Sequence, residues 1–347
     1  MTGMKTCLMP DRRRFLKMAG ATATASLAAP YIASAQSTVL YINTWGGPWQ
    51  QAAMANLIDP FAKKTGIEVK TVSPVSFAKL AQQVKTGTYE FDVTTLGAGE
   101  LVRANHAGIL APLTAPYVGG LFQNGIGSHA FATLIGYRKD KFPNGGPQNW
   151  ADFWDVEKFP GGRSLQRYPA RILPIALLAD GVAVKDLYPL DIDRAFKSLD
   201  KIKPHIRVWW TAGAQAMQTL RDGEVDMIGI WHGNYFEAED AKAPVGMTWN
   251  QAEIERSYWV VAKGTPNIDN AKKFIEFATS AKPLAGFVSQ ANYGPLNPAA
   301  SQFVAADKAK RSPTAPENYA LAFEQDIANF GADQVQVAER FEEWLLS

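Results

Sequence analysis

The sequence has a single cysteine, Cys7, which stands among its first few residues. From residue 8 onward the chain therefore has no thiol for a disulfide or a thiolate metal site. Net charge is also scarce: 35 lysines and arginines against 33 aspartates and glutamates leave +2 at pH 7. Beyond Arg12–Lys17 no long run of basic residues occurs. Nucleic acid is therefore not an expected partner.

No apolar stretch is long enough to span a membrane. The best candidate, Met18–Ile32, is interrupted by polar residues and is too short for a hydrocarbon core of about 30 Å. Before it, the paired arginines Arg12 and Arg13 match a twin-arginine export signal, and Ala33-Ser34-Ala35 matches an A-x-A cleavage site. We predict a signal peptide over residues 1–35 that is cleaved after Ala35, and a mature protein located in the periplasm.

Short apolar strands alternate with amphipathic helices along the rest of the chain. Thr38–Asn43 alternates as a strand, Trp49–Thr65 has helical spacing, and Ile67–Thr71 begins a second strand. The same succession recurs between Trp150 and Thr279, and residues 316–346 read as helical. Such alternation predicts an α/β fold with mostly parallel, doubly wound sheets, in which ligands bind beyond the carboxyl ends of the strands.

Motifs for catalysis or metal binding are missing. The four histidines, at positions 106, 129, 205 and 232, are widely spaced and show no metal-ligand pattern. No Gly-x-Ser-x-Gly elbow, P-loop or phosphate-binding GxGxxG follows a predicted strand. We therefore expect no metal, no cofactor and no enzymatic activity.

Seven short motifs occur in a specific order after residue 40. They are Tyr41–Gly47 (YINTWGG), Phe61–Val69 (FAKKTGIEV), Tyr89–Val93 (YEFDV), Trp150–Trp154 (WADFW), Gly223–Asp226 (GEVD), Ile230–Gly233 (IWHG) and Asn292–Pro298 (NYGPLNP). Each motif alone is weak evidence, but their order and spacing together are specific. In these motifs the chain resembles the periplasmic solute-binding proteins of ABC importers, in particular the spermidine/putrescine-binding branch.

The resemblance implies a two-lobed periplasmic-binding-protein fold of type II, with a doubly wound mixed sheet in each lobe and a hinge between the lobes. Lobe 1 would comprise residues 36–135 and 257–298, and lobe 2 residues 136–256. C-terminal helices over residues 299–347 would pack across the lobes. The protein would be a monomer that closes over a ligand and is then recognised by a membrane permease.

Three tryptophans follow predicted strands, where the resembled fold places its inter-lobe cleft. Trp45 ends the first strand, and Trp210 and Trp231 end two later ones. Indole rings at such positions offer flat apolar walls and cation–π faces. We predict that Trp45 and Trp231 line the cleft, whereas Trp210 has equal claims to the cleft and the core. The more ordinary core position is predicted for Trp49, Trp150, Trp154 and Trp344.

Other candidate ligand contacts come from small and polar residues. Gly46 and Thr211 precede helices whose free N–H groups favour an anionic group, although Gly46 can equally be required by its turn. The resemblance implies a hydroxyl contact from Thr95 and a pocket tyrosine at Tyr293. Ser257 stands where polyamine binders have a carboxylate.

The charged positions of the resembled site differ from those of polyamine binders. Three carboxylate positions of those proteins read Pro169, Ile172 and Ser257 in this chain. A buried dication without counter-charges would cost several kcal/mol. Arg167 and Arg256 stand nearby in the sequence and suit bidentate capture of a carboxylate or phosphonate. Arg171 is a weaker candidate, because it also matches an arginine of the family and can be architectural.

These residues predict a receptor that captures a small organic anion or zwitterion for an ABC permease. One alternative is a polyamine receptor of the same importer class, for which Glu237, Glu253 or Glu255 would supply the counter-charges. A second alternative is an exported enzyme, since twin-arginine export is common among cofactor proteins.

Overall fold

The computed structural model describes residues 31–32, 39–114, 120–330 and 333–347. The predicted twin-arginine motif and cleavage site lie outside the described residues. Tyr31–Ile32 forms a short strand, β1, that pairs antiparallel with β4 (Thr88–Tyr89). Within these described ranges no helix has the length and apolar character needed to cross a membrane.

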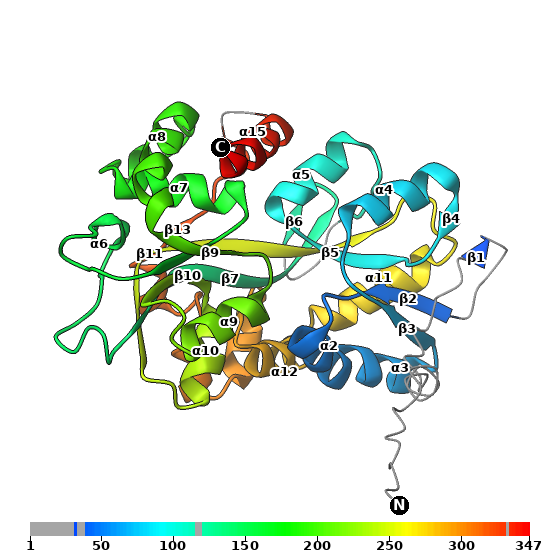
Figure 1. Ribbon diagram of the computed structural model, residues 1–347. Coiled ribbons are helices and arrows are strands. Elements are labelled where there is room, and N and C mark those ends of the chain that lie inside the picture. Colours follow the sequence, from blue (N-terminus) through cyan, green and yellow to red (C-terminus); the bar gives the residue numbers. More distant parts are fainter. Residues whose placement is uncertain (1–30, 33–38, 115–119, 331–332) are drawn as a thin grey trace, which may run out of the picture.

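Among the described residues, one mixed sheet of 11 strands runs through the molecule (Figure 1). Eight of them follow in the order β3-β2-β5-β11-β7-β10-β8-β9, and the short strands β6, β12 and β13 pair with β7 or β11. At one end it carries the parallel strands β2 (Val39–Asn43) and β3 (Glu68–Val72), followed by β5 (Val93–Gly97). At the other end lie β8 (Arg163–Gln166), β9 (Ile206–Trp210) and β10 (Met227–Trp231), which also pair in parallel. The predicted α/β alternation is confirmed at both ends.

Two long strands join the ends of the sheet. β7 (Gly125–Arg138) and β11 (Val245–Val261) pair antiparallel over most of their length, and β11 also pairs with β5 through Ser257–Val261. The pairing of β11 with β7 is irregular between Thr248 and Glu253 and again between Arg256 and Tyr258. We call the part around β2, β3 and β5 lobe 1 and the part around β8, β9 and β10 lobe 2. The predicted lobe boundaries at 135/136 and 256/257 fall inside these two strands.

Lobe 1 is covered by helices on both faces of its part of the sheet. They are α2 (Gly47–Ala53), the π-helical turn Met54–Ile58, α3 (Asp59–Thr65), α4 (Phe77–Thr86), α5 (Ala98–His106), α11 (Ile268–Ala278) and α12 (Ala281–Ala291). Leu40, Ile42 and Phe61 pack in its core with Trp49 and Trp259. The short strands β6 (Leu121–Phe122) and β12 (Gly294–Pro295) pair with β7.

Lobe 2 repeats this arrangement. Its helices are α6 (Trp150–Trp154), α7 (Pro169–Ala179), α8 (Ile192–Ile202), α9 (Gly213–Arg221) and α10 (His232–Asp240), with 3-10 turns at Val184–Asp186 and Lys203–His205. The helix starts follow capping chemistry, because the Asn149 and Asp191 side chains accept hydrogen bonds from the backbone N–H groups of Asp152 and Arg194. Trp150 is fully buried and Trp49 nearly so, as predicted, whereas Trp154 and Trp344, which were also predicted in the core, are only partly buried.

The C-terminal segment differs from the prediction of continuous helix. A 3-10 turn (Pro298–Phe303) and two short helices, α13 (Ala306–Ala309) and α14 (Pro316–Tyr319), come first. The chain then adds a two-residue strand, β13 (Phe323–Glu324), to the edge of β11. Only α15 (Gln334–Leu346) is a long helix. The helical prediction was wrong for β13, because pairing with β11 fixes an extended conformation that local sequence does not show.

Candidate ligand-binding site between the lobes

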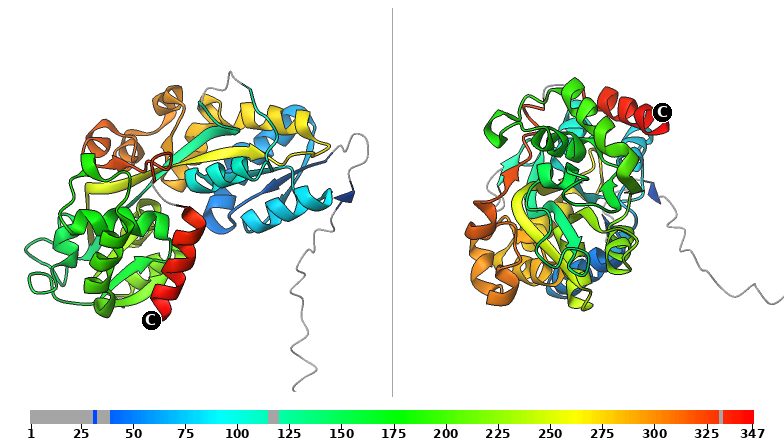
Figure 2. Two further views of the ribbon diagram at one scale, coloured as in Figure 1. Left: turned by 90° about the horizontal axis from the view of Figure 1, so that it is seen from above. Right: turned by 60° about the vertical axis from the view of Figure 1, so that its left-hand side comes forward.

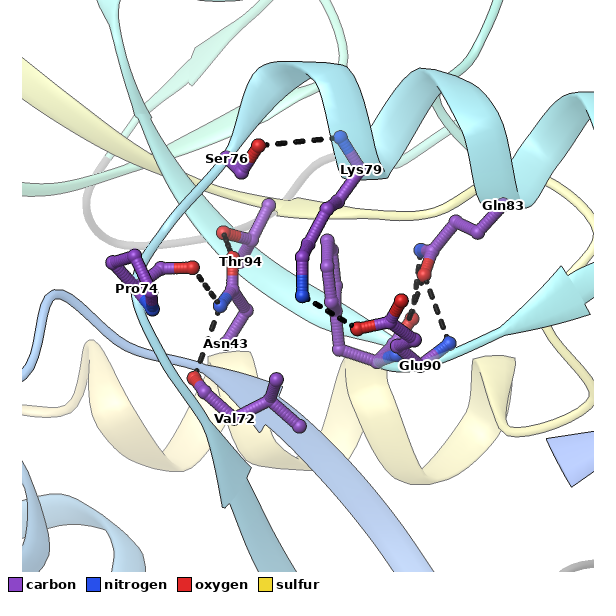
Figure 3. Close-up of polar contacts among 9 residues, drawn as sticks. Asn43, Val72, Pro74, Ser76, Lys79, Gln83, Glu90 and Thr94 are labelled. Atoms are coloured by element: carbon purple, nitrogen blue, oxygen red, sulfur yellow. Dashed lines mark hydrogen bonds and ion pairs between the residues drawn. The ribbon is translucent and has the colours of Figure 1, made fainter. Parts of the chain in front are cut away.

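The lobe 1 side of the candidate site is fixed by a polar network at the strand ends. The Asn43 side-chain amide donates to the carbonyl oxygens of Val72 and Pro74, both at 3.0 Å, and its oxygen accepts from Thr94 at 3.0 Å. Figure 3 shows these contacts tying β2 to the loop after β3 and to β5. Two residues beyond Asn43, the Trp45 Nε1–H donates to the Thr95 hydroxyl at 2.8 Å. Trp45 is therefore held at the strand ends while 49% exposed.

The lobe 2 side carries three aromatic rings at the ends of β8, β9 and β10. Trp231 packs edge-on against Trp210, with ring centroids 4.9 Å apart, and stacks on Tyr168 at 6.0 Å. Trp210 is fully buried and donates from Nε1 to the carbonyl oxygen of Gly229 at 2.9 Å. Trp210, for which cleft and core were equally expected, therefore lies in the core, whereas Trp231 is only partly buried.

Arg171 lies against this aromatic group. Its guanidinium carbon is 4.9 Å from the ring centroid of Tyr168, 5.6 Å from that of Trp231 and 5.4 Å from that of Phe131 on β7. The guanidinium forms a two-point ion pair with Glu255 on β11, of which the Nη2–Oε2 contact is 3.1 Å. Burial disfavours the charged guanidinium, but the charge and hydrogen bonds of Glu255 outweigh it and raise the pKa of Arg171. Arg171 is thus a buried, permanently charged cation with aromatic neighbours.

Charged side chains from both lobes converge where β5 ends. A Cβ atom on Gly97 would lie 2.7 Å from Glu100 Oε2, 3.3 Å from Glu255 Oε2 and 3.9 Å from Arg171 Nη2. Any side chain at Gly97 would therefore collide with Glu100 and crowd the ion pair. Glu100 belongs to α5 of lobe 1, Arg171 to α7 of lobe 2, and Glu255 to a strand that joins them.

A cavity of about 170 Å³ opens beside these charges. Its walls come from the first turns of α5 and α7, from Glu255, and from the C-terminal segment. The lining residues are Gly99, Glu100, Arg103, Tyr168, Pro169, Ala170, Arg171, Glu255, Gln325, Phe330, Gln334, Val337 and Ala338. Two carboxylates and two guanidinium groups are among them, so the charge of the lining is balanced. We had expected positive charge to exceed negative charge in the cleft, and the lining of this cavity has equal numbers of both.

The two arginines predicted to bind the ligand lie in exposed ion pairs instead. Arg167 contacts Glu342 on α15, and the two side chains are 40% and 47% exposed. Arg256 contacts Glu324 on β13 at 2.5 Å, also at the surface. Neither arginine lines the cavity. A ligand role for Arg167 or Arg256 would require these pairs to open, and it stays a prediction.

The smaller candidates are distributed over the strand ends. Gly46 has a φ of 78°, so the turn before α2 itself favours glycine there. Thr211 is exposed, and its carbonyl oxygen accepts the Tyr168 hydroxyl at 2.7 Å. Ser257 is buried, with its hydroxyl 3.5 Å from the Leu96 carbonyl oxygen, and Thr95 is buried beneath Trp45.

Tyr293 belongs to a separate aromatic cluster behind the strand ends. Its ring stacks on His129 with 4.5 Å between centroids and lies 6.0 Å from His232. Burial lowers the pKa of His129 to about 3 and that of His232 to about 4. His232 Nδ1 accepts the backbone N–H of Ala132 at 3.0 Å, which links lobe 2 to β7. Both histidines are thus neutral at pH 7, and within the described residues no group of side chains is arranged to hold a metal ion.

Glu253 lies two residues before Glu255 on the same face of β11 but outside the cavity. Its Oε1 accepts from Gln325 at 3.0 Å, and its Oε2 has no partner among the described residues. Burial, followed by the charge of Glu255, raises the pKa of Glu253 well above its ordinary value. Burial raises the pKa of Glu255 as well, but Arg171 opposes that rise. The two neighbouring glutamates therefore differ in their partners: Glu255 is paired with a cation, whereas Glu253 has none in the described part of the chain and favours its neutral form.

Glu100 and Phe131 were not among the predicted site residues, and Arg171 was only a weaker candidate; Glu100 lines the cavity, and Phe131 packs against Arg171. Glu253 and Glu255 were considered only as counter-charges for a polyamine. One signal was present: Glu253, Glu255 and Ser257 alternate along one strand, so their side chains share a face. Nothing in the sequence shows which residues lie opposite that face.

The model of the family described as bacterial extracellular solute-binding protein matches residues 56–317. The chain belongs to this family. It is 33% identical over 327 residues to the gamma-aminobutyric acid-binding protein of Pseudomonas aeruginosa, covering 90% of this chain and 92% of that protein. Identity to the spermidine/putrescine-binding periplasmic protein of Escherichia coli is lower, 24% over 297 residues, which is 76% of this chain and 78% of that one.

Solved structures agree with this assignment. The crystal structure of an ABC transporter substrate-binding protein from Bradyrhizobium japonicum superimposes with a TM-score of 0.84 at 34% identity, covering 89% of this chain and 100% of that chain. The two-lobed periplasmic-binding-protein fold is thereby confirmed. One detail differs from the prediction of a separate sheet in each lobe: β7 and β11 make the sheet of this solute-binding protein continuous across both lobes.

Proposed function

We propose that this solute-binding protein captures a small zwitterion, with one carboxylate and one ammonium group, and delivers it to an ABC permease. The observation that carries the proposal is the charge-balanced lining of the inter-lobe cavity, where Arg171 faces Glu255 and Glu100 beside an aromatic wall. The gamma-aminobutyric acid-binding relative supports the same ligand class.

Ligand binding exchanges one ion pair for two. The ligand carboxylate contacts the Arg171 guanidinium, whose two-point geometry suits a carboxylate. The ligand ammonium takes the place of the guanidinium beside Glu255 or Glu100, and the faces of Tyr168 and Trp231 favour a cation. The Trp231 Nε1–H, which has no acceptor among the described residues, is available to the carboxylate. Every buried charge keeps a partner throughout.

The balance of charge separates ligand classes. A zwitterion adds one positive and one negative group, so it leaves the cavity neutral. A simple anion would compete with Glu255 for Arg171 and leave a carboxylate unpaired, and a diamine would leave Arg171 next to a second cation. Unpaired buried charges cost several kcal/mol each. A zwitterion is therefore the ligand class that this lining favours.

Closure follows from the positions of the charged groups on different lobes. Glu100 comes from α5 in lobe 1, whereas Arg171, Tyr168 and Trp231 come from lobe 2. A ligand that contacts both sets binds the closed arrangement better than the open one and shifts the population toward it. On closure, Trp45 on lobe 1, now half exposed, would cover the ligand from the opposite side.

The remaining candidates take supporting roles in this proposal. The Thr95 hydroxyl accepts a hydrogen bond from Trp45, and Gly46 forms the turn that follows Trp45. Trp210 packs against Trp231, and the Thr211 carbonyl oxygen accepts the Tyr168 hydroxyl. Ser257 donates to the Leu96 carbonyl oxygen near the end of β5, and Tyr293 packs against His129 and His232. Arg171 takes the anion-binding role that the sequence assigned to Arg167 and Arg256. We further propose export through Arg12-Arg13 with cleavage after Ala35, a monomeric periplasmic receptor, and binding without chemical conversion.

Isothermal titration calorimetry with four compounds of equal chain length tests the ligand class. The purified mature protein is titrated with 4-aminobutyrate, butyrate, butylamine and putrescine. We expect 4-aminobutyrate to bind at least about a hundredfold more tightly than the other three, since each lacks one charge or carries the wrong one. Binding of putrescine alone would support the polyamine alternative, and binding of butyrate as tight as 4-aminobutyrate would remove the role of the carboxylates.

A further inference from the structure

The C-terminal helix α15 is fastened to lobe 2. The Trp344 Nε1–H donates to Asp200 at 2.7 Å, Arg340 contacts Asp193 at 2.7 Å, and Arg167 pairs with Glu342. Phe341 is fully buried and meets the ring of Trp209 edge-on, with centroids 5.8 Å apart. Figure 2 shows α15, in red, lying along the green helices of lobe 2. These contacts from both sides of the helix indicate that α15 moves together with lobe 2.

The first turns of α15 face lobe 1 across the cavity. Gln334, Val337 and Ala338 all line the cavity, and their spacing of three and four residues places them on one face of the helix. Gln334 Oε1 lies 2.9 Å from the position that a Cβ on Gly99 would occupy, so α15 touches the start of α5. Val335 does not line the cavity and is half exposed. The helix is therefore held by one lobe and forms a wall of the site shared with the other.

The cavity that this wall closes is small. An engineered apolar cavity of about 150 Å³ holds a single benzene molecule, whereas pockets for drug-sized ligands span roughly 300–1,000 Å³. At about 170 Å³, this cavity is closer in size to the first than to the second, which favours a short aliphatic zwitterion over a larger conjugate. The polar group of Gln334 and the apolar Val337 and Ala338 supply no charge for a ligand terminus.

We propose that the Gln334–Val337–Ala338 face of α15 is a length gauge that restricts this receptor to short-chain amino acids. The inference rests on the proposed function, because α15 can limit the length of the ligand's methylene chain only if the charged end groups are bound at Arg171 and Glu255. Side-chain volume on α15 then sets the length at which the ligand meets the wall.

A homologous ligand series tests the gauge. Dissociation constants are measured by calorimetry for 3-aminopropanoate, 4-aminobutyrate, 5-aminopentanoate, 6-aminohexanoate and 8-aminooctanoate. For the natural sequence we expect the tightest binding among the shorter members and a loss of about tenfold or more per added methylene once the wall is reached. Ala338→Leu should move the optimum to a shorter ligand, and Val337→Ala should move it to a longer one.

Val335→Ala is the matched control, because it removes the same methyl groups as Val337→Ala from a half-exposed position of the same helix that does not line the cavity. Its length profile should superimpose on that of the natural sequence. Thermal melts of the ligand-free variants show whether each protein is folded, and the ratio of two dissociation constants within one variant is insensitive to a partly unfolded sample.

Two outcomes would overturn the inference, and they can be told apart. If the natural sequence binds short amino acids but all variants keep its length profile, α15 is not the gauge and the proposed function stands. If the natural sequence binds no member of the series, the zwitterion function fails and the gauge fails with it.

Discussion

The inter-lobe cavity and the outer surface of lobe 2 each hold an arginine–glutamate pair, and the two arginines are only four residues apart in sequence. The Arg171 and Glu255 side chains are 12% and 6% exposed, whereas those of Arg167 and Glu342 are 40% and 47% exposed. The buried pair has lost its hydration and cannot lose one partner without a large cost, but water can replace either partner of the exposed pair. Burial, and not the presence of an arginine, therefore separates a ligand anchor from a surface contact.

The largest expected effect comes from removing the buried cation. Arg171→Met leaves Glu255 buried without a counter-charge, so we expect a loss of about 3–5 kcal/mol in the free energy of unfolding. Binding of 4-aminobutyrate should weaken by more than about a hundredfold, because the ligand carboxylate loses its partner. Urea denaturation measures the first quantity and calorimetry the second.

A second variant separates folding from binding at the same position. Arg171→Met combined with Glu255→Gln removes both charges, so stability should recover relative to Arg171→Met alone. Binding should remain lost. Recovery of binding in the double variant would show that Arg171 acts only on the fold.

The next effect contrasts the two glutamates of β11. Because burial raises the folded-state pKa of Glu253 above the unfolded value of 4.5, its contribution to stability is fully present below pH 4.5 and falls as the pH rises toward the folded-state pKa. Glu253→Gln should therefore match the natural protein near pH 4.5 and be more stable, by about 1–3 kcal/mol, at pH 8. Thermal melts across this pH range measure the difference.

Glu255→Gln is the matched comparison, since it makes the same chemical change two residues away on the same strand. It leaves the Arg171 guanidinium unpaired, so it should destabilise the protein at pH 8. The opposite signs at Glu253 and Glu255 are the expected result. Equal destabilisation by both variants would contradict the neutral state of Glu253.

The smallest expected effect is at the exposed pair, where the sequence predicted a ligand contact. Arg167→Ala should change the dissociation constant of 4-aminobutyrate by less than about fivefold, because an exposed ion pair contributes little and the side chain lies outside the cavity. The melting temperature should be nearly unchanged. A loss of affinity greater than tenfold would restore Arg167 to the ligand contacts and would require the pair with Glu342 to open.

Local sequence was sufficient for most of the fold. Trp45 and Trp231 were predicted near strand ends because each belongs to a recognisable motif; Trp45 follows β2 by two residues, Trp231 ends β10, and their contact with a ligand stays a prediction. The crossing strands β7 and β11 were not recognised over their full lengths. Their pairing joins residues more than a hundred positions apart, such as Thr133 with Glu253, and such long-range contacts leave no periodic signal in either segment.

The charged residues show the same limit. Arg167 and Arg171 belong to one short segment, and no propensity states which of them turns inward. The answer depends on Glu255, which reaches the first turn of α7 only because β11 crosses between the lobes. A cation in the first turn of a helix, such as Arg171 in α7, interacts unfavourably with the helix dipole. A carboxylate partner from another part of the chain offsets this, and the sequence of the segment itself does not show which one.

The two irregularities in the β11–β7 pairing bracket Glu253–Arg256, the stretch that presents Glu255 to Arg171. Because the ladder is interrupted at these two points, we expect rotation of the lobes to concentrate on either side of this stretch. Glu255 would then lie close to the rotation axis, where atoms are displaced least, whereas Glu100 on α5 would move with lobe 1. We therefore expect Glu255 to keep its place beside α7 as the lobes rotate, and Glu100 to move with lobe 1 toward the bound ligand.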